Sequence, residues 1–273
     1  MTSFADALAL RAVELGAAEG DRYTAETMPD WGQGRAALGG LVAGWGLRAL
    51  AGRVDPSRSL RSVQVSFVGP VAPGTAEVVS RVLRTGRALT CGEARISQGG
   101  EDCAVVLAVY GASRPTNLVW PAPPMLPAPS PDSIDPMVYQ EGVTPVFTRH
   151  LDYRWATKFM HFSGGDQPEV GGWIRIHDSG PLDAAGMLSL LDAWPAPILT
   201  LLHRQAPAST VTWMVNLLAA PPPEGWPELG WWRFHGSTVA AGDGYADITG
   251  RLWGPDGNLV ATSRQLVAEF SGR

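Results

Sequence analysis

The chain is poor in cysteine, which excludes several classes of site. Among its 273 residues only Cys91 and Cys103 are cysteines, and nothing around them has metal-ligand spacing. A disulfide framework or a zinc centre therefore has no support, and reduced thiols in a cytoplasm fit best. We expect a cytoplasmic protein without a metal and without a cofactor.

Positive charge is scattered, and the first residues do not have the pattern of a leader segment. The formal net charge is −5, and no basic stripe exists that would neutralise the phosphates of a nucleic acid. Residues Met1 to Asp6 lack a basic region followed by a long apolar run, and no apolar stretch approaches the roughly 20 residues of a membrane helix. We expect a soluble, unexported protein that binds no nucleic acid and has no membrane span.

Apolar residues and proline, by contrast, are plentiful. The hydrophobic share of 45% is ample for a buried core. Between Trp120 and Pro136, prolines prevent both helix and interior strand. This predicts a linker over residues 119–145 that joins an N-terminal unit (1–118) to a C-terminal unit (146–273).

The same order of elements recurs on both sides of the linker. Each half reads as a helix followed by alternating segments bounded by Gly and Pro, which are typical of strands. In the first half the helix covers 38–50 and the strands 59–67, 75–85, 88–98 and 103–110. In the second half the helix covers about 182–202 and the strands 209–218, 231–239, 245–253 and 259–270.

One helix against four or more long antiparallel strands is buried best when the sheet curls around it, which is the hot-dog arrangement. A single unit would leave a sheet edge uncovered, so we expect the second unit to continue the sheet. The predicted fold is α+β, a double hot-dog with two long antiparallel sheets, each wrapped around a central helix.

The start of the first helix is rich in glycine. Gly39, Gly40, Gly44 and Gly46 each cost roughly 0.8–1 kcal/mol relative to Ala inside a helix. Either the helix packs so closely that only small side chains fit, or the bare N–H groups at its start hold a carbonyl oxygen or an anion. The glycines alone slightly favour close packing.

Several motifs, in this order and spacing, resemble the type II acyl-CoA thioesterases, which are double hot-dog proteins. The resemblance covers nearly the whole chain and is carried by Leu38-Gly39-Gly40, Phe67-Val68-Gly69-Pro70, Leu83-Arg84-Thr85-Gly86-Arg87, Gln98-Gly99, Asp192, Thr210 and Gln265. It implies that Asp192, Thr210 and Gln265 bind and polarise a water that attacks a thioester. It also implies that Gly39 and Gly40 contact the substrate through backbone N–H groups.

The chemistry of these side chains agrees with that implication. Asp192 can accept the proton of the water, Gln265 can hold water or substrate through its amide, and Thr210 can both donate and accept. A thiol with a pKa of about 8.5 is a fair leaving group, so no protein nucleophile is needed. Ser209 replaces Thr210 if the strand is shifted by one residue.

We therefore expect an acyl-CoA thioesterase of lipid metabolism with one site per chain, and a homodimer as the simplest closed assembly. Coenzyme A and an acyl carrier protein both remain open as the thiol carrier. Two other functions also remain open. One is a hot-dog hydratase or dehydratase, which normally needs a His beside the Asp, and the other is a non-catalytic protein that binds acyl thioesters.

Overall fold

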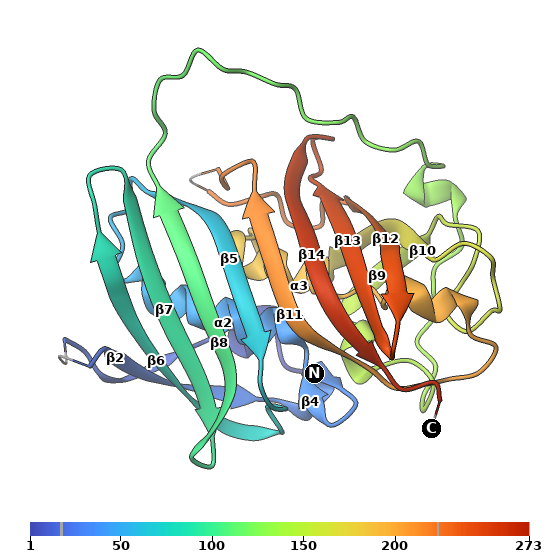
Figure 1. The fold of residues 1–273 in the computed structure, drawn as a ribbon, viewed down its shortest axis with the longest axis horizontal. Coiled ribbons are helices and arrows are strands. Elements are labelled where there is room, and N and C mark those ends of the chain that lie inside the picture. Colours follow the sequence, from blue (N-terminus) through green and yellow to red (C-terminus); the bar gives the residue numbers. More distant parts are fainter. Residues whose placement is uncertain (17–18, 223, 273) are drawn as a thin grey trace.

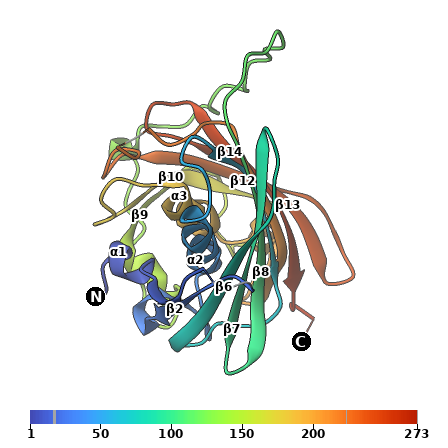
Figure 2. The same cartoon turned by 90° about the vertical axis from the view of Figure 1, so that its left-hand side faces the viewer.

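Twelve strands form one antiparallel sheet that curls around two helices (Figures 1 and 2). The computed structural model describes residues 1–16, 19–222 and 224–272. The strand order in the large sheet is β1-β2-β6-β7-β8-β5-β11-β14-β13-β12-β10-β9, and β3 and β4 form a separate two-stranded sheet. The first half of the chain supplies one side of the large sheet and the second half supplies the other.

The first half contains the elements α1, η1, α2 and β1 to β8, where η marks a short 3₁₀ helix. Their bounds are α1 Phe4–Ala7, β1 Arg11–Glu14, β2 Asp21–Thr27, η1 Pro29–Trp31, β3 Gly32–Gln33, β4 Ala36–Ala37, α2 Gly39–Ala51, β5 Ser59–Phe67, β6 Gly74–Thr85, β7 Leu89–Gln98 and β8 Glu101–Gly111.

The second half repeats this plan after the linker. Its elements are η2 Pro131–Ser133, η3 Val146–His150, β9 Leu151–Trp155, β10 Glu169–Ile176, α3 Ala184–Asp192, η4 Pro197–Leu201, β11 Ala208–Leu217, β12 Trp232–Gly242, β13 Tyr245–Trp253 and β14 Leu259–Glu269.

The two halves join through β5 and β11, which pair antiparallel with Val63 opposite Val215 and Val65 opposite Trp213. All four of these side chains are buried. The expected double hot-dog fold and the continuation of the sheet from one unit into the next are therefore confirmed. The boundaries of the units at 118 and 145 stay a prediction.

Helices α2 and α3 lie next to each other on the concave side of the sheet (Figure 2). A Cβ at Gly40 would lie 2.6 Å from the Cα of Ser189, and one at Gly44 would lie 3.2 Å from the carbonyl oxygen of Ala185, so α3 leaves no room for a side chain at Gly40. A Cβ at Gly46 would lie 2.9 Å from a methyl group of Val106 in the sheet. Close packing therefore explains these glycines, because Gly40 and Gly44 lie against α3 and Gly46 lies against the sheet.

The second-half helix is shorter than the sequence predicts. Instead of running from about 182 to 202, α3 ends at Asp192, and the chain turns at Pro195 before the short helix η4. Pro195 and Pro197 lack the N–H that a continuing helix requires. Asp192 is therefore the last residue of α3 and not a mid-helix residue.

By length and composition the segment Ala184–Leu201, with a mean hydropathy of 1.3, could cross a membrane, which the sequence analysis did not anticipate. The core helix of a folded domain passes the same test, and 67% of this segment is buried inside the protein.

Six strands were missed. Four of them, β1, β2, β9 and β10, lie toward the two ends of the large sheet, and β3 and β4 form the separate two-stranded sheet. The proline-rich segment agrees better with its prediction. It contains only the 3₁₀ turn η2 and an isolated bridge between Pro136 and Arg154, and it arches from the end of β8 to the far side of the second half (Figure 1).

Candidate active site

Asp192 connects the two halves of the protein. The backbone N–H of Gly40, at the start of α2, donates a hydrogen bond of 2.8 Å to Oδ2 of Asp192, which ends α3. The Oδ2 atom would also lie 3.0 Å from a Cβ at Gly39. The carboxyl group of the second half thus sits at the N-terminus of the first-half helix.

The sequence of α2 explains why it accepts a partner from another helix. Its N-cap residue is Leu38, which makes no side-chain capping hydrogen bond, and its first turn contains no acidic residue. The first N–H groups of a helix need an acceptor, and the helix dipole favours a negative charge at that end. Asp192 supplies both, so it acts as an N-cap that comes from 152 residues away.

Burial is the main influence on the ionisation of Asp192. It raises the pKa of the Asp192 carboxyl from its ordinary 3.8 to about 7, whereas the Gly40 N–H, the Gln265 side chain and the Gly39 N–H lower this pKa in part. The residue nevertheless keeps partial solvent exposure. A partly accessible carboxyl with a pKa near neutrality is suited to accept a proton from water.

Thr210 and Gln265 lie on the face of the sheet that is turned toward the helices. Gln265 of β14 pairs with the buried residues Trp213 of β11 and Ile248 of β13. Thr210 of β11 pairs with Val267, which is also buried. Because paired residues share a face, Thr210 and Gln265 point to the same side and are diagonal neighbours across the two strands.

A β-bulge decides which side chain of β11 faces inward. The pairing with β14 shifts between Thr210 and Thr212, so Val211 has no partner of its own. Strict alternation from the buried Trp213 would turn Thr210 outward, whereas the extra residue returns it to the inner face. Ser209 is exposed, so Thr210 and not Ser209 lies on the inner face in this structure.

Aromatic residues that the sequence analysis missed lie beside Asp192. The hydroxyl group of Tyr153 donates a hydrogen bond of 2.9 Å to the carbonyl oxygen of Ala193, directly after Asp192. Burial, followed by the charge of Asp192, holds the pKa of Tyr153 well above its ordinary value. Trp194 contacts Tyr153 edge-on and stacks on Phe234, each at 5.4 Å between ring centroids.

The strand that carries Tyr153 did have a signal in the sequence. In Leu151-Asp152-Tyr153-Arg154-Trp155 apolar and charged residues alternate, which is typical of a half-buried strand. Phe67, at the end of β5, belongs to the Phe67-Val68-Gly69-Pro70 motif, which by itself indicates no role for the ring. Its ring would lie 3.0 Å from a Cβ at Gly39, so it covers the start of α2 beside Asp192.

The structure thus brings four of the five predicted site residues together: Asp192, Gly39, Gly40 and Gln265. The fifth, Thr210, lies on the same inner face, and the hydrogen bonds described for the site do not include it. Among residues 1–16, 19–222 and 224–272, no group of three His, Cys, Asp or Glu side chains is placed to hold a metal ion.

Comparison with known families matches both halves of the chain. Residues 127–268 match the acyl-CoA thioesterase C-terminal domain, and residues 27–111 match the acyl-CoA thioesterase N-terminal domain. The chain belongs to the acyl-CoA thioesterase family. Its double hot-dog fold and its resemblance to type II thioesterases agree with this membership.

Solved structures show the same fold over nearly the whole chain. A hot-dog protein of unknown function from Alicyclobacillus acidocaldarius is 23% identical, with a TM-score of 0.85 and 99% of each chain covered. A putative thioesterase II from Thermobifida fusca is 26% identical, with a TM-score of 0.80 and coverage of 99% of this chain and 98% of that one. The acyl-CoA thioesterase II TesB2 from Mycobacterium marinum is 19% identical, with a TM-score of 0.75 and coverage of 98% and 99%. A search of curated proteins found no match.

Proposed function

We propose that this member of the acyl-CoA thioesterase family hydrolyses an acyl thioester to a free acid and a thiol, with Asp192 as the base that activates water. The observation that supports this role is the position of the Asp192 carboxyl. It is held at the N-terminus of α2 by Gly40, near the Gln265 side chain, with its pKa raised by burial to about 7.

In the proposed reaction, Asp192 accepts a proton from a water molecule while the water oxygen forms a bond to the thioester carbonyl carbon. The carbon–sulfur bond of the tetrahedral intermediate then breaks, and the proton passes from Asp192 to the departing thiolate. The products are one carboxylic acid and one thiol. Gln265 and Thr210 orient the water, since an amide and a hydroxyl can each donate and accept a hydrogen bond.

The developing oxyanion needs hydrogen-bond donors. The Gly40 N–H donates to Asp192 and the Gly39 N–H also interacts with this carboxyl, so both groups help to hold the base. We assign the oxyanion to the positive end of α2, with the Gly39 N–H shared between the Asp192 carboxyl and the oxyanion, because N–H groups at a helix start stabilise negative charge. In this proposal Gly40 positions the base, and Gly39 contributes both to the base and to the oxyanion.

The decisive experiment replaces Asp192 with Asn, which keeps an oxygen that can accept from Gly40 but removes the base. We expect kcat to fall roughly 10²–10⁴-fold with little change in thioester binding, as for the loss of a positioned general base. Thiol release from a panel of acyl-CoA substrates would be followed with a disulfide reporter dye. Enzyme without substrate serves as a blank, because the dye also reacts with accessible protein thiols such as the partly exposed Cys91.

Asp166→Asn is the matched control, because Asp166 is exposed in the loop before β10 and its replacement should leave kcat unchanged. A fully active Asp192→Asn enzyme would contradict the proposed role of Asp192. Wild-type protein that binds acyl thioesters without turnover would instead identify a binding protein. Hydration of an enoyl thioester would identify a hydratase, although the interactions described for Asp192 include no histidine.

Four further expectations stay predictions. They are the choice of thiol carrier between coenzyme A and an acyl carrier protein, which the sequence leaves open, a role in lipid metabolism, a cytoplasmic location and a homodimer.

A further inference from the structure

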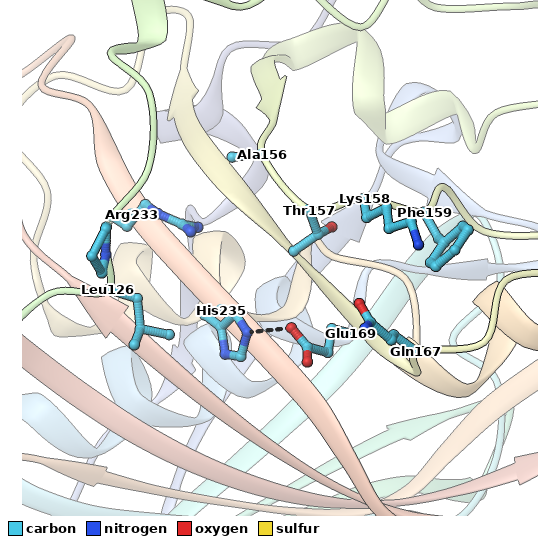
Figure 3. A pocket seen from close by; sticks show the side chains of 10 residues that line it. Leu126, Ala156, Thr157, Lys158, Phe159, Gln167, Glu169, Arg233 and His235 are labelled. Atoms are coloured by element: carbon cyan, nitrogen blue, oxygen red, sulfur yellow. Dashed lines mark hydrogen bonds and ion pairs between the residues drawn. The ribbon is translucent and has the colours of Figure 1, made fainter.

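A pocket of about 320 Å³ lies on the outer face of the second-half sheet, under the linker (Figure 3). Trp232 and Phe234 of β12 point inward, where they pack against Trp226 and Trp194. Arg233 lies between them and therefore points outward. The pocket is lined by Arg233, His235, Glu169, the loop from Ala156 to Phe159, Gln167, and Leu126 and Pro127 of the linker.

Arg233 is a buried cation without an acidic partner. It is 2% exposed, and the ion pairs found among the described residues do not include it. Its guanidinium lies against the backbone of β10 and β12, where Nη1 donates to the carbonyl oxygens of Gly172, at 3.1 Å, and Phe234. Its Nε is buried and has no hydrogen-bond partner in the described structure.

The neighbouring strand is adapted to this side chain. A Cβ at Gly171 would lie 3.1 Å from Nη1 of Arg233, so glycine leaves the space that the guanidinium occupies. Burial lowers the pKa of Arg233 to about 10, which leaves it charged at neutral pH. A buried charge that lacks a counter-ion is costly unless another group compensates it.

A second buried donor lines the same pocket. Oγ1 of Thr157 is buried without a hydrogen-bond partner in the described structure, and the exposed Lys158 follows it. The acid of the pocket, Glu169, is engaged by Nε2 of His235 at 3.1 Å (Figure 3). The pocket thus contains two unpartnered donors and two further basic side chains against one carboxylate that is already paired.

We propose that this pocket binds a small organic anion, a carboxylate or a phosphate monoester. The anionic group accepts hydrogen bonds from Nε of Arg233 and Oγ1 of Thr157, and its apolar part lies against Leu126, Pro127 and Phe159. A volume of about 320 Å³ lies within the range of small-molecule sites. The site does not include Asp192, Thr210 or Gln265, and its test does not depend on hydrolysis.

The test is isothermal titration calorimetry of the full chain at constant ionic strength, with chloride as the reference anion. Benzoate and phenyl phosphate are the probes, and acetate and inorganic phosphate show what the anionic group contributes alone. We expect one-to-one binding of benzoate or phenyl phosphate, and the tighter of the two identifies the preferred group. Thr157→Val, which keeps the shape of the side chain, should weaken that binding roughly tenfold through the loss of one hydrogen bond to a charged group.

Arg251→Met is the matched control, because Arg251 is exposed on β13 opposite His235 and lies outside the pocket. Its affinity for the probe should equal that of the wild type. Arg233→Met should abolish binding of the probe if this variant folds. If Arg233→Met does not fold, the affinity of Thr157→Val for the probe tests the proposed site. The proposal is overturned if neither probe binds more tightly than chloride, or if Thr157→Val binds as the wild type does.

Discussion

Gly40 and Asp192 lie 152 residues apart in the chain and are joined by a hydrogen bond of 2.8 Å. One belongs to the helix of the first half and the other ends the helix of the second half. The bond satisfies a free N–H at the start of α2 and places a carboxylate at the positive end of its dipole. The candidate site is therefore complete only when both halves are folded against each other.

The pH dependence of the rate should report Asp192. Because burial raises the pKa of its carboxyl to about 7 and the reaction needs the ionised form, kcat/KM should rise tenfold per pH unit below about pH 7 and level off above it. The Gln265 side chain lowers this pKa, so Gln265→Ala should move the rise to higher pH. The exposed Gln33→Ala serves as the control. A rise centred near 4, where ordinary carboxyls titrate, would contradict the assignment.

The stability of the fold should also depend on the ionisation of Asp192, and the raised pKa of this carboxyl fixes the direction of the dependence on pH. The pKa of Asp192 is higher in the folded chain than in the unfolded chain, so the folded state binds the proton more tightly. This contribution to stability is complete below the unfolded pKa and is lost as pH rises through about 7. Relative to Asp192→Asn, the wild type should therefore lose on the order of a few kcal/mol between about pH 5 and about pH 8.

Urea unfolding of both proteins at the two pH values measures this difference. The exposed Asp166→Asn variant should follow the wild type at both. Equal changes in wild type and Asp192→Asn would show that the carboxyl titrates normally.

The two glycines at the start of α2 should respond differently to a methyl group. At Gly40 the new Cβ would lie 2.6 Å from the Cα of Ser189, so Gly40→Ala forces α2 and α3 apart and should cost roughly 1–3 kcal/mol of stability. At Gly39 the obstacles are the side chains of Asp192 and Phe67, each at 3.0 Å, which can move. Gly39→Ala should therefore fold but hydrolyse thioesters more slowly, because it displaces the carboxylate.

Thermal unfolding measured together with thiol release separates the two effects. Gly52→Ala, at the other end of α2, meets no atom closer than 3.9 Å and should alter neither quantity. A Gly39→Ala enzyme with wild-type kcat would argue against a role for the start of α2.

Because of the bulge in β11, substitutions at Thr210 and at Ser209 should affect kcat differently. Thr210→Val keeps the shape of an inward side chain and removes its hydroxyl, so kcat should fall roughly tenfold, as expected for one hydrogen bond. Ser209→Ala changes an exposed side chain and should leave kcat unchanged. The reverse pattern would mean that β11 is shifted by one residue in the active enzyme.

The amino-acid sequence by itself determined the main elements and supplied the candidate residues for the site. Alternating apolar residues bounded by Gly and Pro locate eight strands to within two residues at nearly every end, because periodicity is a local property of a half-buried sheet. It missed β1, whose residues are all exposed and so do not alternate, and β10, whose Gly171 and Gly172 weaken the strand signal. It also identified Asp192, Thr210 and Gln265 as candidates through motifs and their order.

Only the tertiary structure decided how these residues meet. The raised pKa of Asp192 depends on burial between two helices from different halves, and the inward direction of Thr210 depends on the bulge at Val211. The unpartnered Nε of Arg233 in the described structure likewise follows from the packing of β10, β12 and the linker. Burial, register and contacts between distant residues arise from the assembled chain, so no local pattern of residues contains them.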